Sequence, residues 1–195
     1  MRSPQTILDA VHTLTTDAHD FKTLVVDTLD WAEPLCWAHV CAAAKEPDIE
    51  AFGYGKGYTA ALDAWHVFLG RLDTLRAKRR MHVILLAHSW IKAFKNPEGD
   101  DFDRYELKLN AKAGGRVKEW CDAVLFANYE TFAVAKKDKR VRGVSSGARV
   151  IHTERRAAFD AKNRYGLPET LPLSWDDFAA GVAAADGKTG FITAL

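Results

Sequence analysis

One short apolar run that ends in an acid constrains the fold of this chain more strongly than any other feature. The run Leu24–Val26 has polar residues on either side and is followed directly by Asp27 and Thr28. β-branched runs of this length between polar flanks are typical of buried strands in parallel sheets. The carboxyl end of such a strand is where doubly wound α/β folds bind ligands. Asp27 therefore either contributes to a ligand site or caps the helix that follows.

Two further apolar runs predict that this strand belongs to a larger sheet. His82–Ala87 ends at His88 and Ser89, and Asp122–Ala127 follows a helical segment. Apolar residues at helical spacing occupy the segments between the runs, so helices and strands alternate along the chain. We therefore expect an α/β fold in which helices flank a mainly parallel sheet.

Three other segments carry their own structural signals. Asp30 and Glu33 resemble a capping box that opens the helix after the first strand. The polar segment Trp90–Leu109 is long for a loop in a compact domain, and such loops are usually functional or disordered. Thr131–Ala135 and Arg149–Glu154 flank a basic turn region, which predicts a late β-hairpin.

Length, charge and cysteine content narrow the class of protein. We expect a single domain over residues 1–195, because this length suits one sizeable core. A formal net charge of +1 does not by itself indicate a nucleic-acid partner. Three cysteines without a C-x-x-C pair favour a reducing cytoplasm over a disulfide framework. No apolar stretch of the sequence is long enough to cross a membrane.

The sequence lacks the glycine-rich loop that cradles nucleotide phosphates in many ATP-binding proteins. That loop has the pattern G-x-x-x-x-G-K-[ST] between a strand and a helix. The segment Gly53–Gly57 comes close, but Glu50 occupies the first glycine position and Gly57 occupies the Ser/Thr position. The segment Gly187–Thr189 also fails, because Gly181 lies one residue too far upstream. The strand-end acid is thus present without a phosphate loop.

The order and spacing of these segments resemble the RecA-like core of P-loop ATPases. The matching segments, in chain order, are FKTLVVDTLDW, FGYGKGY before a long helix, MHVILLAHS, CDAVLFANYE and FDAKNRYGLPETLPLSW. More narrowly, they are similar to phage-encoded ATPases of single-strand annealing and recombination, over nearly the whole chain from Gln5 to Phe178. The resemblance implies a RecA-like parallel sheet with a C-terminal β-hairpin, from which the N-terminal P-loop unit is absent. It also implies that the chain is either a truncated product or a degenerate subunit.

The resemblance assigns nucleotide-site roles to residues at the strand ends and near the C-terminus. Asp27 would hold Mg²⁺ through water as the Walker B acid, and Thr28 would support it. His88 would occupy the position of the sensor residue that reports on the γ-phosphate of ATP. Lys162 and Arg164 would act on the ATP of a neighbouring subunit, as an arginine finger does. These roles imply ATP and Mg²⁺ as cofactors and a homo-oligomer or filament as the assembly.

The same resemblance implies single-stranded DNA as a partner. The DNA-binding loop would be Trp90–Lys112, in which aromatic side chains stack on bases. Basic residues for the DNA phosphates come from this loop and from the turn of the predicted hairpin: Lys92, Lys95, Arg104, Lys108, Lys136, Lys137 and Arg140. A structural alternative stands beside each role, because aromatic residues also pack loops onto a core and lysines also simply face solvent.

Three functional hypotheses remain open. The first is an ATP-dependent DNA recombination or annealing protein, encoded by a phage or prophage, that acts in the bacterial cytoplasm and is represented here by a truncated chain. The second is a non-catalytic RecA-like module that binds DNA or a partner. The third is an unrelated α/β enzyme with Asp27 and His88 as an acid–base pair, although no nucleophile motif supports it. Whether this chain hydrolyses ATP is also open, since the family it resembles does so but the phosphate loop is absent from the sequence.

Overall fold

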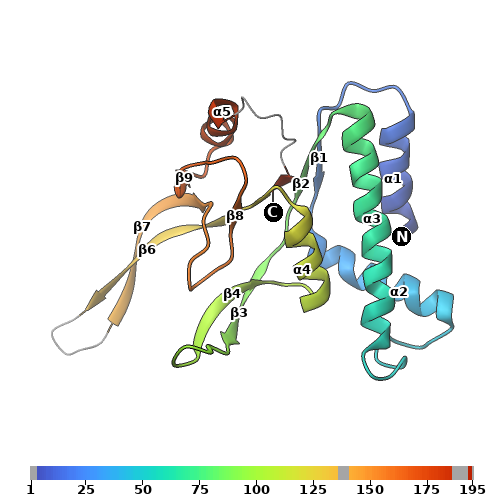
Figure 1. The fold of residues 1–195 in the computed structure, drawn as a ribbon, viewed down its shortest axis with the longest axis horizontal. Coiled ribbons are helices and arrows are strands. Elements are labelled where there is room, and N and C mark those ends of the chain that lie inside the picture. Colours follow the sequence, from blue (N-terminus) through green and yellow to red (C-terminus); the bar gives the residue numbers. More distant parts are fainter. Residues whose placement is uncertain (1–3, 136–140, 186–192, 195) are drawn as a thin grey trace. The chain divides into compact units, whose positions relative to one another are not determined.

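The chain folds into two compact units, which Figure 1 draws as a ribbon. A computed structural model describes residues 4–135, 141–185 and 193–194. The first unit comprises residues 1–121 with 191–195, and the second comprises residues 122–190. The single domain over residues 1–195 that the sequence predicts stays a prediction, because two compact units can belong to one domain.

A three-stranded parallel sheet is the centre of the first unit. Its strands are β1 (Thr23–Val26), β2 (His82–Leu85) and β10 (Thr193–Ala194), in the order β1-β2-β10. Val26 of β1 lies opposite Leu85 of β2, so both strands end at the same edge. The fold is mixed α/β as predicted, but the parallel sheet is shorter than expected. Every other strand pair within the described residues is antiparallel.

Four helices accompany this sheet, and α3 (Lys56–Arg79) is the longest of them. Its large buried side chains recur at helical spacing, as the sequence predicted: Trp65, Phe68, Leu69, Leu72 and Leu75. α1 (Pro4–Thr16) and α2 (Leu29–Ala44) pack against α3, and α4 (Ala111–Trp120) also contacts it (Figure 1). None of the helices in the described part of the chain is both long and apolar enough to cross a membrane.

An antiparallel hairpin stands where the sequence predicted a long loop. β3 (Ser89–Phe94) and β4 (Phe102–Leu107) pair along their whole length, with Ser89 opposite Leu107 and Phe94 opposite Phe102. Aromatic and β-branched residues are interspersed with polar ones in these strands, a composition that favours β-structure. At the tip, the Asn96 backbone N–H donates a 3.1 Å hydrogen bond to Asp101 Oδ1. The many charged residues of this segment led to the prediction of a loop.

Antiparallel pairs make up the second unit. Its elements are β5 (Ala123–Val124), β6 (Phe126–Ala135), β7 (Val141–His152), β8 (Lys162–Asn163), β9 (Thr170–Pro172) and α5 (Trp175–Ala185). β5 pairs with β8, while β6, β7 and β9 form one sheet in the order β6-β7-β9. The segment Asp122–Ala127, predicted as a third parallel strand, is therefore divided between β5 and β6. β6 pairs antiparallel with β7 because residues 136–140 are too few for the crossover that a parallel pair needs.

Candidate functional site

An open cleft of about 910 Å³ lies along β1 and beyond its carboxyl end. Asp27, Thr28 and His88 all line it, together with residues of α1 and α2. The Leu86 backbone N–H donates a 2.9 Å hydrogen bond to the Val26 carbonyl, which extends the contact between β1 and β2 to this edge. The polar residues that follow the two strands therefore line one cleft at the same edge of the sheet.

Asp27 is the exposed acid at the tip of β1. Its carboxylate has no hydrogen-bond or ion-pair partner in the described part of the chain. The alternative that Asp27 caps α2 is wrong, because Thr28 is the N-cap residue and makes no side-chain capping bond. The peptide bond between the two residues is cis. An unengaged carboxylate in a cleft thus remains available to a ligand.

The donor set at this edge suits part of a magnesium–nucleotide site. Mg²⁺ usually keeps several waters and takes one or two carboxylates together with substrate phosphates. Among the described residues, no three acidic, histidine or cysteine side chains gather into a metal-binding cluster. Asp27 would therefore be a single protein ligand to a hydrated ion, and the phosphate cradle has no counterpart among these residues.

His88 is held by a second acid, Asp30, in the first turn of α2. The Nδ1 atom of His88 lies 2.9 Å from Asp30 Oδ2, and the His88 backbone N–H donates a 3.1 Å bond to Asp30 Oδ1. The Asp30 side chain is only 4% exposed, whereas that of His88 is 62% exposed. Burial by itself raises the pKa of Asp30, but the hydrogen bonds from the His88 backbone and imidazole lower it to about 2.

The ionised Asp30 determines which ring nitrogen of His88 is left without a partner from α2. A carboxylate only accepts hydrogen bonds, so Nδ1 of His88 must carry a proton. In the neutral imidazole Nε2 is then the unprotonated nitrogen, and in the charged imidazole it is a second donor. Asp30 thereby orients His88 and makes its second ring nitrogen the one available to a ligand of the cleft.

Glu33, the other half of the predicted capping box, also bonds far from the helix start. It is buried, and both of its carboxylate oxygens lie 3.0 Å from the Asn110 backbone nitrogen, which precedes α4. Burial raises the pKa of Glu33, as does the nearby charge of Asp30, although the bond from Asn110 opposes the shift. The capping-box prediction is therefore wrong, since both acids bond to distant segments of the chain.

The hairpin predicted to bind DNA begins and ends beside His88. The Lys108 backbone N–H donates a 2.9 Å hydrogen bond to the His88 carbonyl, which closes the base of the hairpin. Lys92 and Lys108 are exposed, and Lys92 Nζ lies 4.0 Å from the ring centroid of Trp90. Trp90 and Lys92 stand on one face of β3, because alternate residues of a strand share a face. This face combines a cation with an exposed aromatic ring.

Two basic residues of the same hairpin are already engaged. Lys95 forms an ion pair with Asp101 near the tip. Arg104 is only 4% exposed, and its Nε lies 3.1 Å from Glu106 Oε1. Arg104 therefore stabilises the hairpin and is not accessible to a phosphate group in this conformation. The predicted contacts Lys136, Lys137 and Arg140 lie outside the described residues.

Lys162 and Arg164 belong to a tightly bonded turn of the second unit. Asn163 organises this turn: its side-chain nitrogen donates to the Leu167 carbonyl at 2.8 Å, and its side-chain oxygen accepts the Leu167 N–H at 3.1 Å. Lys162 is half-buried in β8, whereas Arg164 is exposed and its Nη1 lies 3.1 Å from Asp122 Oδ1. Arg164 thus has an intramolecular partner in this conformation.

The glycine-rich segment that nearly matched a phosphate loop has a packing role. Gly55 is the N-cap residue of α3 and has a positive φ of 68°. Gly57 is buried in the first turn, and a Cβ atom there would lie 2.2 Å from the Ile49 carbonyl oxygen. Glycine is required at Gly57 because the loop before α3 crosses so close to the helix.

Comparisons with known proteins identify one matching family. Residues 1–165 match the family model described as an AAA domain. No curated protein and no solved structure matches the chain. The matched range includes β1, β2, the β3–β4 hairpin and residues up to 165, which take in Asn163 and Arg164.

Proposed function

The chain belongs to the AAA domain family of P-loop ATPases, and from this membership we propose that it is a RecA-like nucleotide-binding protein of phage DNA recombination or annealing. The proposal places its work in the cytoplasm of a bacterial host. The observation that carries it is the edge where Asp27, His88 and the base of the β3–β4 hairpin meet.

The cleft is the proposed nucleotide-facing surface. Asp27 supports this role because its carboxylate is exposed and unengaged, as a ligand for hydrated Mg²⁺ must be. A bound Mg²⁺ would neutralise charge on the nucleotide phosphates. Thr28 lines the same cleft and would assist Asp27, while His88 would turn Nε2 toward a phosphate oxygen, with Asp30 holding Nδ1.

The β3–β4 hairpin is the proposed contact for single-stranded DNA. Lys92 and Lys108 are exposed to meet phosphates, and Trp90 offers an aromatic face on which a base can stack. Lys95 would have to leave Asp101 to contribute, and Arg104 would act by supporting the hairpin. His88 lines the cleft, and its carbonyl also accepts the bond that closes the hairpin. A ligand that moves His88 would therefore also move the proposed DNA-binding hairpin.

The assembly is proposed to be a homo-oligomer or filament. Lys162 and Arg164 would then approach the nucleotide of a neighbouring subunit. Arg164 is exposed and paired with Asp122. To bind a phosphate, its guanidinium would leave the Asp122 carboxylate and form charge-assisted hydrogen bonds to the phosphate oxygens. The pair with Asp122 would keep the guanidinium in place until the neighbour binds.

A second candidate function is a non-catalytic module that binds DNA or a protein partner. The observation that favours it is the lack of the pattern G-x-x-x-x-G-K-[ST] anywhere in the 195 residues. Without that loop, the described residues offer no backbone nest and no phosphate-loop lysine to neutralise the β- and γ-phosphates. Under this hypothesis the chain binds single strands equally well with and without ATP.

Fluorescence anisotropy with a labelled single-stranded oligonucleotide tests the DNA-binding proposal. We expect weak binding that falls steeply with salt, because phosphate contacts release counterions. Replacing Lys92 and Lys108 together by Ala should lower the slope of log affinity against log salt by about 1.4, at about 0.7 for each single-strand contact. The matched control replaces Lys22 and Lys78, two exposed lysines outside the hairpin.

Three outcomes separate the hypotheses. An unchanged slope in the Lys92/Lys108 variant would remove the hairpin from the proposal. Phosphate release that exceeds an Asp27→Ala control would show catalysis and exclude the non-catalytic module. An absence of oligonucleotide binding at low salt would leave a protein partner as the ligand of this module.

A further inference from the structure

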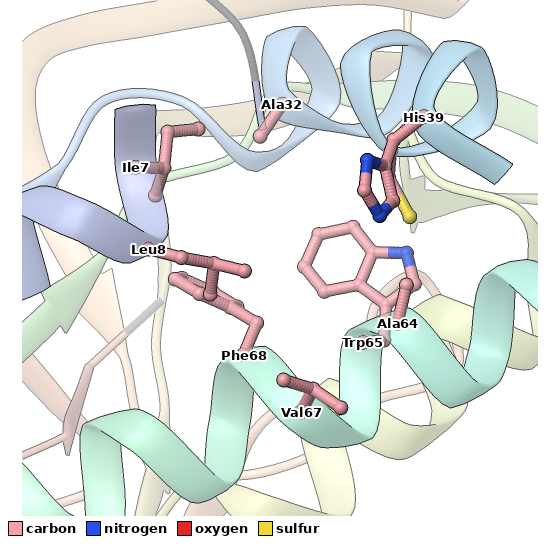
Figure 2. A pocket seen from close by; sticks show the side chains of 9 residues that line it. Ile7, Leu8, Ala32, His39, Ala64, Trp65, Val67 and Phe68 are labelled. Atoms are coloured by element: carbon pink, nitrogen blue, oxygen red, sulfur yellow. The ribbon is translucent and has the colours of Figure 1, made fainter. Parts of the chain in front are cut away.

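We propose that a second pocket, between α1, α2 and α3, binds a small neutral compound with one aromatic ring and a hydrogen-bond acceptor next to the ring. The pocket has a volume of about 140 Å³ and lies in the helical part of the first unit (Figure 2). Ile7 and Leu8 of α1, Ala32 of α2, and Val67 and Phe68 of α3 form its apolar walls. Ile7 and Ala32 also line the cleft beside β1.

A buried donor without a partner is the observation that points to a ligand. Trp65 lines the pocket and is only 3% exposed, yet its Nε1 atom has no hydrogen-bond partner within the described residues. Figure 2 shows the indole ring of Trp65 in the pocket, with its nitrogen on the side where His39 lies. Leaving a buried N–H unpaired is unfavourable, so a ligand that supplies an acceptor there would relieve that loss.

The size of the pocket selects a single ring. Engineered cavities of roughly 150 Å³ with walls of leucine, isoleucine and phenylalanine bind benzene. One water molecule occupies only about 30 Å³ and needs two to four polar partners. A water between Trp65 and His39 would therefore leave most of the 140 Å³ without contacts. An aromatic ring fills the apolar part, and its acceptor reaches the Trp65 N–H.

The charge of the walls selects a neutral compound. Among the described residues, no lysine, arginine, aspartate or glutamate lines the pocket. Cys36 lines it, and burial, together with the charge of Glu33, raises the pKa of this thiol to about 11, so the sulfur is uncharged at neutral pH. A cation placed here would lose its hydration without a carboxylate beside it, and an anion would find only the His39 imidazole among the described wall residues. Val67, one of the wall residues, is 52% exposed, so this wall of the pocket adjoins solvent.

A pair of matched probes tests the proposal on the full chain. Acetophenone carries a carbonyl oxygen next to its ring, and α-methylstyrene has the same shape with a CH₂ group in place of that oxygen. We expect acetophenone to bind about three- to tenfold more tightly, which corresponds to one net hydrogen bond. Its binding should shift one of the six indole N–H resonances in a nitrogen–proton NMR spectrum, and Trp65→Phe identifies that resonance.

Variants locate the site and keep the test independent of folding defects. Trp65→Phe keeps a ring but removes the donor, so the two probes should bind it equally. Ala64→Leu should fill the pocket and abolish binding of both, whereas Ala77→Leu, on an exposed position of the same helix, should leave binding unchanged. The circular dichroism of each variant verifies that α3 is intact.

Several results would overturn the proposal. Equal affinity of the two probes for the wild-type chain, or binding that survives Ala64→Leu, would place the ligand elsewhere. Failure of both probes to bind up to their solubility limits would show that the pocket is only a packing defect. Tighter binding of N-acetylphenylalaninamide than of acetophenone would assign the pocket to a peptide partner and exclude a free small molecule as its occupant.

Discussion

Strands β1 and β2 are neighbours of equal length and similar apolar character, yet they are buried to very different degrees. In β2, Val83 and Leu85 are 0% exposed. In β1, Val25 is 49% exposed, and Leu24 and Val26 are only half-buried. β2 has a strand on each side, whereas β1 pairs only with β2 among the described strands.

The difference separates a strand that stabilises the fold from one that lines a site. All three apolar residues of β1 line the same cleft as Asp27 and His88. Parallel strands are usually covered on both faces, so the exposed face of β1 is a surface on which a ligand or partner can be received. The polar residues that follow the two strands also differ in how firmly they are held. Asp27, after β1, has no partner in the described part of the chain, whereas His88, after β2, is bonded to Asp30.

The largest expected effect tests this comparison directly. Leu85→Ala should lower the free energy of unfolding by about 3 kcal/mol, because it leaves a cavity in the core. Val25→Ala should cost less than about 1 kcal/mol, because half of the valine already faces solvent. Urea denaturation of both variants measures the difference. Equal losses would show that β1 is covered as completely as β2.

Glu33 extends the comparison to α2, the helix that starts where β1 ends. Glu33→Ala should cost about 2 kcal/mol, because the partly buried Asn110 N–H loses its acceptor. Glu33→Gln keeps an acceptor and should cost less than about 1 kcal/mol.

The pH dependence of Glu33 has a defined sign. Its raised pKa means that the folded state binds the proton more tightly than the unfolded state does. Stability due to this group therefore falls as the pH rises above the ordinary value of 4.5. Urea titrations across this range should show a shallower fall in Glu33→Gln, and an identical slope in both proteins would contradict the assignment.

The two acids after β1 provide a matched pair with a smaller effect. Asp30→Asn should cost about 1.5 kcal/mol at neutral pH, because it weakens two charge-assisted bonds to His88. Asp27→Asn should leave stability unchanged, because its carboxylate has no partner in the described part of the chain.

Acid denaturation distinguishes the same pair. The pKa of Asp30 is lowered from 3.8 to about 2, so its contribution is complete above pH 3.8 and is lost as the pH falls toward 2. The wild type and Asp27→Asn should share this loss, and Asp30→Asn should lack it. If all three proteins lose the same stability between pH 3.8 and pH 2, the Asp30–His88 bond does not stabilise the fold.

The smallest effect concerns ligand binding at the exposed end of β1. When Mg²⁺ with ATP is present at a concentration equal to its Kd, stability should rise by about 0.4 kcal/mol. Thermal unfolding with Mg²⁺ and with a chelator measures this increment. We expect Asp27→Asn to lose the magnesium-dependent part, and an undiminished increment in that variant would place the metal elsewhere.

Features encoded locally could be predicted from the sequence. The runs that became β1 and β2 are bounded by polar residues, and the apolar spacing of α3 spans many turns. Membership in a P-loop ATPase family followed from the order of several short segments. The exposure of β1 had no local signal, because burial depends on which other elements cover a strand.

Features that depend on distant partners could not be predicted. The spacing of Asp30 and Glu33 is the same whether they bond to their own helix or elsewhere. Their partners are 58 and 77 residues away in the sequence, at His88 and Asn110. Similarly, the run Asp122–Ala127 contains no information on whether its neighbour is parallel or antiparallel. Tertiary bonding decided each of these cases.

Because the base of the β3–β4 hairpin is closed by a hydrogen bond, the outer part of the hairpin can vary in length and sequence without disturbing the rest of the fold. The chain leaves the sheet edge at His88 and returns through the Lys108 N–H, so both ends are fixed at one point. Residues inserted at the tip, around Asn96–Asp101, would lengthen the hairpin at little entropic expense and would leave the cleft unchanged. Substitutions or insertions in the outer hairpin can therefore alter what the protein binds while the Asp30–His88 pair at its base is kept.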